Sequence, residues 1–234
     1  MAKQNPLWGA ERIRGELLKL GIKLCKRTVQ RHMPKVRKES SQTWATFLKN
    51  HAGDIWACDF TVVHDLLFRP QYIFVVIELQ TRRIVHTAVT RSPTDDWTAP
   101  QLREATPWGK GPKYLIRDRD NKYGPLFLNV AKSTGITVLK TPVRAPKANA
   151  ICERFIGSLK RECLDHMLTL HSYQLHHIVR AYVDYYNHSR PHQGIGQRVP
   201  AQLPRTYPPS SGQIIATPVL GGLHHAYSRA AYLH

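Results

Sequence analysis

The chain has 234 residues, of which 42% are hydrophobic, and its 34 Lys and Arg against 16 Asp and Glu give a formal net charge of +18. This apolar content is enough for one or two folded domains and excludes a wholly disordered chain. No run reaches the roughly 18–20 apolar residues of a membrane span, and the first residues lack the apolar segment of a secretory signal. Four widely spaced cysteines with no Cys-x-x-Cys pair argue against a disulfide scaffold and a zinc knuckle, and they fit a reducing cytoplasm.

The positive charge is concentrated in stretches that contain no acidic residue. One stretch lies between Glu16 and Glu39, a second lies between Asp120 and Glu153, and a third follows Asp184. Such surfaces attract polyanions, and nucleic acid is the commonest polyanion in a cytoplasm. A basic face that only contacts solvent, a ribosome or a membrane surface is the alternative interpretation.

Residues 7–38 are expected to be helical. Ile13, Leu17 and Leu20 recur at helical spacing, Gly21 breaks the pattern, and a second short helix runs over 26–33. Two helices across a glycine turn favour a partial helix-turn-helix over residues 1–38, although a plain helical hairpin fits as well. Its second helix would enter the major groove of DNA with four candidate contact residues. They are Arg27, Thr28, Gln30 and Arg31.

Residues 39–53 are expected to be a linker, and residues 54–200 to be an α/β core. Strands are predicted over 55–63, 72–79, 83–90, 113–118 and 136–140, and helices near 95–105, 124–134, 149–168 and 172–188. This order predicts a mixed sheet flanked by helices, in which the second and third strands are antiparallel neighbours. Residues 201–234 form a C-terminal extension rich in Pro, Gly and His, for which no secondary structure is predicted.

Three acidic residues occupy positions where chemistry could occur. Asp59 lies within an apolar strand, Asp118 ends another strand, and Glu153 lies one turn into the long helix, on one face with Asn149 and Lys160. Each acid alone also has a structural explanation, as a buried hydrogen-bonded acid, a turn residue or a partner of the helix dipole. Together, three carboxylates would bind hard cations such as Mg²⁺, and two such ions promote phosphodiester displacement.

The acids and several motifs resemble a known superfamily. Asp59, Asp118 and Glu153 resemble the DDE triad of the retroviral-integrase superfamily, and within it the chain is similar to insertion-sequence transposases with an integrase-like catalytic core. The matching stretches cover nearly the whole chain in the family's order. They are Trp8 to Leu17, Ile55 to Thr61, Ala148 to Phe155, Leu159 to Glu162, and Tyr186 to Gln193.

The resemblance implies a ribonuclease-H-like fold with five mixed strands. It implies two Mg²⁺ or Mn²⁺ ions on Asp59, Asp118 and Glu153, hydrolysis at transposon ends, and strand transfer of the freed 3′-hydroxyl into target DNA. Lys160 matches the family's DNA-contacting basic residue on the catalytic helix, and Asn149 matches its frequent polar residue one turn before the Glu. Both are expected DNA contacts, as is Lys147 in the basic stretch before the helix. The expected partner is double-stranded DNA, bound by a homo-oligomer at the nucleoid in the cytoplasm of a bacterium, with no role for a membrane.

The chain departs from the family pattern in three ways. Asp120 stands where the family usually has a small residue, so it competes with Asp118 as the second carboxylate, and Asp118 is preferred because it ends the strand. Arg117 and Arg119 flank Asp118 and are expected to pair with its carboxylate. Relatives usually carry more helix-turn-helix sequence upstream, which suggests a truncated or decayed copy.

Two alternatives to a transposase remain open on the sequence. A catalytically decayed DNA-binding protein would keep the basic surface without metal-dependent activity, and a ribonuclease-H-type nuclease would act on RNA–DNA hybrids.

Two other features have structural interpretations. Asp95 and Asp96 are expected to begin a helix, and Cys152 and Cys163 have no matched histidine base for a thiol nucleophile.

Overall fold

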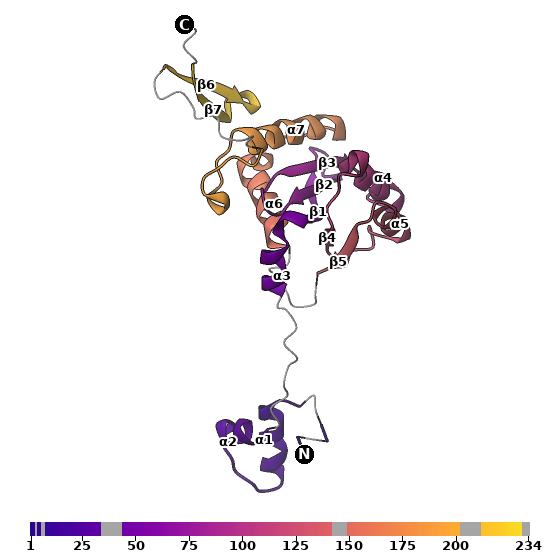
Figure 1. The fold of residues 1–234 in the computed structure, drawn as a ribbon, viewed down its shortest axis with the longest axis vertical. Helices are drawn as coiled ribbons and strands as arrows, with labels where there is room; N and C mark the ends of the chain where they lie inside the picture. Colours follow the sequence, from indigo (N-terminus) through magenta and orange to yellow (C-terminus); the bar gives the residue numbers. More distant parts are fainter. Residues whose placement is uncertain (3, 6–7, 34–43, 142–148, 202–211, 231–234) are drawn as a thin grey trace. The chain divides into compact units, whose positions relative to one another are not determined.

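The computed structural model describes residues 1–2, 4–5, 8–33, 44–141, 149–201 and 212–230 (Figure 1). The chain divides into two compact units, Met1–Thr43 and Trp44–His234, and each is described by itself. Within the described residues, no helix is long and apolar enough to cross a membrane.

The N-terminal unit contains helices α1 (Ala10–Lys19) and α2 (Lys26–His32). Ala10, Ile13 and Val29 are buried between them, and the connecting turn places Gly21 at φ +77°, a left-handed conformation that glycine adopts without strain. Leu20 lies beyond the end of α1 and is exposed, so the buried stripe is shorter than the pattern predicted. The two short helices and the turn between them are present as expected.

Five strands form the sheet of the larger unit, in the order β3-β2-β1-β4-β5. β1 pairs antiparallel with β2 and parallel with β4, β2 pairs antiparallel with β3, and β4 pairs parallel with β5. The strands are β1 (Ile55–His64), β2 (Pro70–Glu78), β3 (Ile84–Thr90), β4 (Tyr114–Arg117) and β5 (Thr137–Lys140). The mixed sheet confirms the predicted fold class, and each strand lies within about two residues of its expected range.

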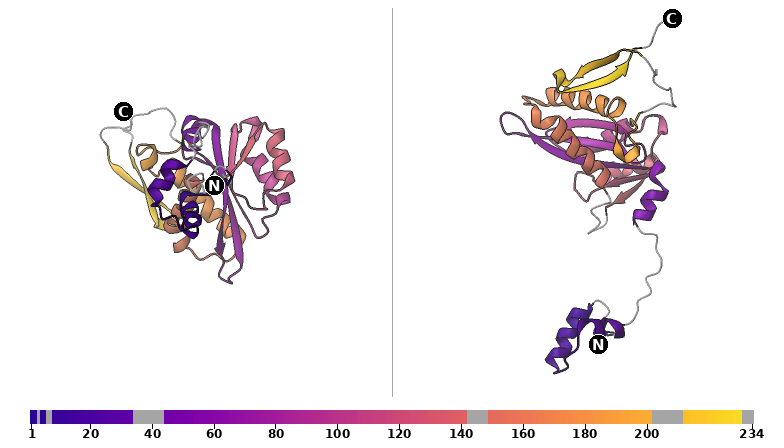
Figure 2. Two further views of the ribbon diagram at one scale, coloured as in Figure 1. Left: turned by 90° about the horizontal axis from the view of Figure 1, so that it is seen from below. Right: turned by 90° about the vertical axis from the view of Figure 1, so that its left-hand side faces the viewer.

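Helices cover both faces of this sheet (Figures 1 and 2). α4 (Asp95–Ala105) and α5 (Pro125–Ser133) cover one face, and α6 (Ala150–Glu162) and α7 (Ser172–His188) cover the other. Side chains alternate along a strand, so Ile55 and Ala57 of β1 pack in the core under α6 and α7, while Trp56 and Cys58 pack in the core under α4 and α5. This alternation decides which face each polar residue of β1 points to.

Two elements differ from the expected boundaries. Residues 44–50, inside the expected linker over 39–53, form helix α3 (Trp44–Asn50), because Trp44, Phe47 and Leu48 pack against the core under α6 and α7. The α6 helix ends at Glu162 rather than near Leu168. Short 3₁₀ turns complete the larger unit. They are η1 (Ala52–Asp54), η2 (Pro107–Gly109), η4 (Leu164–His166), η5 (Gln193–Ile195) and η6 (Leu220–Gly222).

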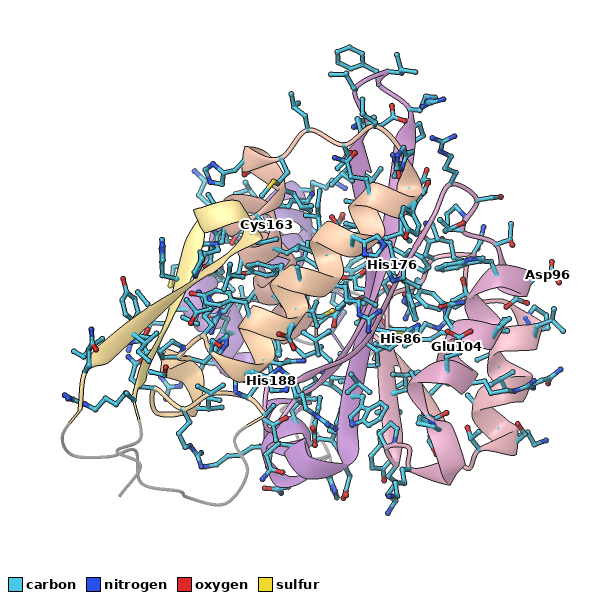
Figure 3. All side chains as sticks on the ribbon, turned by 90° about the horizontal axis from the view of Figure 1, so that it is seen from above. His86, Asp96, Glu104, Cys163, His176 and His188 are labelled. Carbon is cyan, nitrogen blue, oxygen red and sulfur yellow. The ribbon has the colours of Figure 1, made fainter. Side chains whose placement is uncertain are left out.

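The C-terminal extension contains a hairpin that the sequence did not predict. Strands β6 (Ile214–Val219) and β7 (His224–Arg229) pair antiparallel. The hairpin lies beside α7, with Cys163 at the end of α6 nearby (Figure 3). His224 Nε2 donates to the carbonyl oxygen of Glu162 at 2.7 Å, and its ring stacks on Tyr185 with centroids 5.0 Å apart. These contacts hold the hairpin against α6 and α7.

Candidate active site

The pairing of β1 with β4 brings two of the predicted acids to one edge of the sheet. The last parallel pair is Ala57 with Ile116; Asp59 lies two residues after Ala57 within β1, and Asp118 lies two residues after Ile116, directly after the end of β4. Side chains two residues apart share a face, so both acids follow residues that pack in the core under α6. Neighbouring strands lie about 4.8 Å apart, so this register places Asp59 on β1 beside the end of β4, where Asp118 follows.

The beginning of α6 lies against Asp59. Asn149, the residue before the helix, is buried, and its Nδ2 donates a hydrogen bond of 2.9 Å to Asp59 Oδ2. Asp59 Oδ1 accepts from the amide of Phe60 at 2.8 Å. Cys152, Phe155 and Leu159 bury the opposite side of α6 in the core. The same packing therefore presents Glu153, which is exposed in the first turn, at the end of the helix nearest Asp59.

The Asp59 carboxylate lies in an environment that disfavours its negative charge. Burial, together with the negative charges of Asp118, Glu153 and Asp120, raises the pKa of Asp59 to about 6. No Lys or Arg forms an ion pair with Asp59 in the described part of the chain. Asp118 and Glu153 are therefore close enough to act electrostatically on Asp59, and no ion pair among the described residues neutralises the Asp59 carboxylate.

The choice between Asp118 and Asp120 follows from the neighbours of each side chain. Asp120 forms an ion pair with Lys122, and although burial alone would raise its pKa, the hydrogen bonds from Lys122 lower it. Asp118 Oδ1 accepts the amide of Asp120 at 3.2 Å, and Asp118 acts on the pKa of Asp59 more strongly than Asp120 does. These contacts favour Asp118 as the free carboxylate.

The two flanking arginines do not pair with Asp118 as the sequence predicted. Arg117 is buried, and its Nη1 donates to the main-chain oxygens of Asp118 at 3.0 Å and Asp120 at 3.4 Å. Arg119 Nε donates to the carbonyl oxygen of Thr141 at 3.2 Å. Arg117 also lies over the ring of Tyr123, so its guanidinium is held by this ring and by the main chain of the loop that follows β4. Both arginines therefore donate to main-chain oxygens, and neither forms an ion pair with the Asp118 carboxylate.

The donor atoms gathered here suit a hard divalent cation. They are carboxylate oxygens and an amide, and Asn149 Oδ1 is buried with no hydrogen-bond partner. As the side chains stand, the described residues contain no group of three or more His, Cys, Asp and Glu side chains arranged to hold a metal ion. The chemistry of the donors therefore fits Mg²⁺. In the side-chain positions of this structure, Asp59 Oδ2 accepts a hydrogen bond from Asn149.

The remaining predicted residues are distributed over both units. Lys160 is partly exposed in the last turn of α6, two turns from Glu153. Lys147 lies outside the described residues. In the N-terminal unit the four candidate DNA contacts lie on α2, where Val29 is the buried residue and Thr28 Oγ1 hydrogen-bonds Cys25 Sγ at 3.1 Å. The exposed residues among the four are Arg27, Gln30 and Arg31.

The buried thiols have no part in this site. Cys58, Cys152 and Cys163 are buried, and burial raises the pKa of each thiol well above its ordinary value. They stay protonated at neutral pH and pack as small apolar residues. This agrees with the absence of a matched histidine base in the sequence.

The motif from Tyr186 to Gln193 has a structural role that its sequence alone did not reveal. Asn187 Oδ1 accepts the amide of Ile84 at 2.9 Å, and Asn187 Nδ2 donates to the Ile84 carbonyl at 2.9 Å, which attaches α7 to β3. Arg190 donates to both carboxylate oxygens of Glu162, at 2.8 and 2.6 Å. The motif therefore joins α7 to the sheet and to the end of α6.

Comparisons with known proteins agree with this architecture. Residues 134–200 match the family model "Integrase core domain". An insertion element IS476 uncharacterized 39.2 kDa protein of Xanthomonas euvesicatoria is 27% identical over 158 residues, which is 66% of this chain and 45% of that protein. The chain thus spans about half the length of the curated relative it matches.

Two solved structures share the fold. A chain in the structure of the simian T-cell lymphotropic virus intasome in complex with PP2A regulatory subunit B56 gamma gives a TM-score of 0.55 at 14% identity, covering 76% of this chain and 67% of that chain. The trimeric form of the HTLV-2 integrase catalytic core domain in complex with magnesium gives 0.51 at 13% identity, covering 64% and 94%. The fold is therefore ribonuclease-H-like, the class to which retroviral integrase cores belong. The family match and the insertion-element relative confirm the resemblance to insertion-sequence transposases with an integrase-like core.

Proposed function

We propose that this protein is a DNA transposase, a polynucleotidyl transferase that hydrolyses a phosphodiester at a transposon end and joins the freed 3′-hydroxyl to target DNA. The observation that carries the proposal is the arrangement at one edge of the sheet, where Asp59 of β1 lies beside the end of β4 that precedes Asp118, and the hydrogen bond from Asn149 brings the beginning of α6, with Glu153, against Asp59. Carboxylates that repel one another at the edge of a sheet, with no cation from the protein, are typical of a site for divalent ions.

Asp59, Asp118 and Glu153 are proposed to hold two Mg²⁺ or Mn²⁺ ions. When bound, such ions activate the attacking oxygen and stabilise the leaving oxygen of an in-line displacement. Asn149 fixes the orientation of the Asp59 carboxylate through the hydrogen bond of 2.9 Å. Lys160, on the same helix face as Glu153, would bind a phosphate of the DNA strand, and Lys147 a neighbouring one. The structural neighbour in complex with magnesium supports the choice of metal.

The partner is proposed to be double-stranded DNA, both transposon ends and target. A net charge of +18 supports binding to a polyanion, and Arg27, Thr28, Gln30 and Arg31 on α2 would contact the end sequence. The intasome and the trimeric core among the structural neighbours support a homo-oligomer. The proposed organisation is a DNA-binding segment over 1–38, a linker that leads into α3, a catalytic core to residue 200 and an extension over 201–234. We place the protein at the bacterial nucleoid, in the cytoplasm.

The test is a strand-transfer assay on end DNA with Mg²⁺ or Mn²⁺. Wild-type protein should nick the end and join it to target DNA, and Asp59→Asn, Asp118→Asn and Glu153→Gln should each abolish both products while DNA binding is retained. Asp120→Asn should keep activity, because Asp120 is bound to Lys122. Cleavage of RNA–DNA hybrids but not of end DNA would favour a ribonuclease-H-type nuclease. DNA binding without a metal-dependent rise in melting temperature would favour a decayed DNA-binding protein.

A further inference from the structure

A cavity of about 430 Å³ lies on the α6 and α7 side of the sheet, away from the acids. α6 lines it with Arg154 and Ser158, the turn between β2 and β3 with Arg82, and the end of α7 and the residues after it with Tyr186, Arg190 and His192. Neither an aspartate nor a glutamate is among the described residues that line it. His188, labelled in Figure 3, marks the end of α7 beside this region.

The three arginines of this cavity differ in how their charge is compensated. Arg190 is neutralised, because it binds both oxygens of Glu162, and it also donates to His192 Nδ1 at 3.1 Å. Arg82 and Arg154 have no acidic partner among the described residues. Burial is the main cause that lowers the pKa of Arg82. The positive charge of Arg154 lies close enough to lower this pKa further. Arg82, which is half-buried, and Arg154, which is exposed, thus line one cavity with no ion-pair partner among the described residues.

Arg82 is held in place by the fold rather than free to turn into solvent. Its backbone lies in the left-handed region at φ +68°, which costs a non-glycine residue free energy, and its Nε is buried with no hydrogen-bond partner. A Cβ added to Gly194 would lie 3.6 Å from Arg82 Nη2, so the guanidinium lies along the η5 turn. A buried N–H without a partner destabilises the fold, and more so on a charged group, unless a ligand accepts from it.

The geometry points to a phosphate-binding site in this cavity, with Arg82 and Arg154 as the donors. A guanidinium group binds phosphate oxygens in a bidentate manner and is the preferred donor for this group in proteins. An anion accepting from both side chains would satisfy Arg82 Nε and neutralise two charges at once. The neighbouring His192 is neutral and fixed, since Nδ1 accepts from Arg190 and Nε2 donates to the Tyr186 carbonyl at 3.3 Å.

The phosphate group is assigned to the backbone of bound DNA, and this part of the inference rests on the proposed function. Arg154 follows Glu153 directly on α6, so the helix that carries the proposed metal ligand also carries the proposed phosphate donor on an adjacent face. A DNA strand that leaves the acids and passes around α6 would reach the cavity. The same chemistry would also accept free inorganic phosphate, and the experiment separates the two sources.

The experiment measures the salt dependence of binding to a short duplex of mixed sequence. Arg82→Gln and Arg154→Gln each remove one cavity charge, and Arg103→Gln removes an exposed charge from α4 as the matched control. Loss of one phosphate contact should reduce the slope of log Kobs against log salt by about 0.9 for either cavity variant, with no change for the control. Arg154→Lys should keep the slope, because it keeps the charge. Denaturant unfolding of each variant separates misfolding from loss of binding.

A second arm compares melting temperatures in phosphate and in chloride at equal ionic strength. A reduced slope for both cavity variants supports the site and its assignment to DNA. A rise in melting temperature with phosphate for the wild type but not for the variants, with unchanged slopes, supports a phosphate site and overturns the DNA assignment. No effect in either arm overturns the proposal. Absence of strand transfer by the wild-type protein would instead contradict the proposed function, whatever the salt dependence of DNA binding shows.

Discussion

Asn149 and Asp59 lie 90 residues apart in the chain and share a hydrogen bond of 2.9 Å. The bond joins the beginning of α6, which carries Glu153, to the middle strand of the sheet, which carries Asp59. It also explains why Asn149 is buried although it precedes the helix, where a polar residue would ordinarily face solvent. The amide thereby fixes the direction of the Asp59 carboxylate before any ligand binds.

We expect Asn149→Ala to lower strand-transfer activity more than it lowers stability. The variant loses a hydrogen bond to a carboxylate, worth about 1–2 kcal/mol, but it also removes the buried oxygen that has no partner, so the free energy of unfolding should fall by about 1 kcal/mol. Activity should fall at least tenfold, because misplacing a metal ligand by about 1 Å costs that much or more. Denaturant unfolding and single-turnover strand transfer measure the two quantities.

Asn129→Ala is the matched control, since Asn129 is exposed on α5 and faces solvent. It should leave both quantities unchanged within about 0.5 kcal/mol. Equal losses of stability and activity in Asn149→Ala, or full activity, would show that Asn149 does not position Asp59.

Replacing Asp59 should stabilise the metal-free protein while it removes activity. The carboxylate is partly buried near Asp118 and Glu153, and these surroundings oppose its charge. In Asp59→Asn the charge is gone, and Asn149 can turn its amide so that Oδ1, now without a partner, accepts from the new side chain. We expect the free energy of unfolding at pH 8 to rise by about 1 kcal/mol.

Asp54→Asn provides the comparison, because Asp54 is exposed in η1 and no ion pair involves it in the described residues. Its effect should stay within about 0.5 kcal/mol. A clear loss of stability in Asp59→Asn would mean that the carboxylate is a structural acceptor and that the acids do not form a repulsive site.

The sequence predicts this fold well because each of the five strands carries an apolar run and amphipathic stretches mark the helices between and after them. It also predicts which acids are candidates, since Asp59 lies on β1 and Asp118 directly follows β4, and the topology makes these two strands neighbours. Their catalytic roles, and that of Glu153, remain predictions. The side-chain contacts that position these acids could not be predicted from neighbouring residues in the sequence. Arg117 was expected to pair with Asp118 because the two are adjacent, but the backbone oxygens of the loop bind its guanidinium instead.

Asp95 is a second case in which the local pattern was incomplete. Asp95 and Asp96 predict a helix start, and α4 does begin at Asp95, where Thr94 caps the helix by accepting from the Trp97 amide at 3.3 Å. The Asp95 carboxylate, however, turns to the other helix of that layer and accepts the amides at the beginning of α5. These are the amides of Gly124 at 2.9 Å, Leu126 at 2.8 Å and Phe127 at 2.9 Å.

Asp95→Ala should therefore destabilise the protein by about 2 kcal/mol, the upper range for loss of a helix cap, since three amides lose their acceptor. Asp96→Ala, the adjacent exposed acid on α4, is the control, and its cost should be a few tenths of a kcal/mol from the helix dipole. Urea unfolding compares the two variants. Equal effects would mean that Asp95 acts only through the dipole of α4.

The ion pair between Glu162 and Arg190 should make stability depend on pH in the acid range. Burial alone would raise the pKa of Glu162, but hydrogen bonds from Arg190 and Tyr182 outweigh burial and lower it. Because the folded pKa lies below the unfolded value of about 4.3, the stabilisation is complete above that pH and is lost as pH falls through the folded pKa. Glu162→Gln should cost about 2 kcal/mol at pH 7, and the difference from wild type should shrink below about pH 4. Glu104→Gln, an exposed acid on α4 that lies 4.0 Å from His86, should show no such convergence. A pH-independent cost for Glu162→Gln would indicate that packing, rather than the charge of Glu162, holds the end of α6 to the residues after α7.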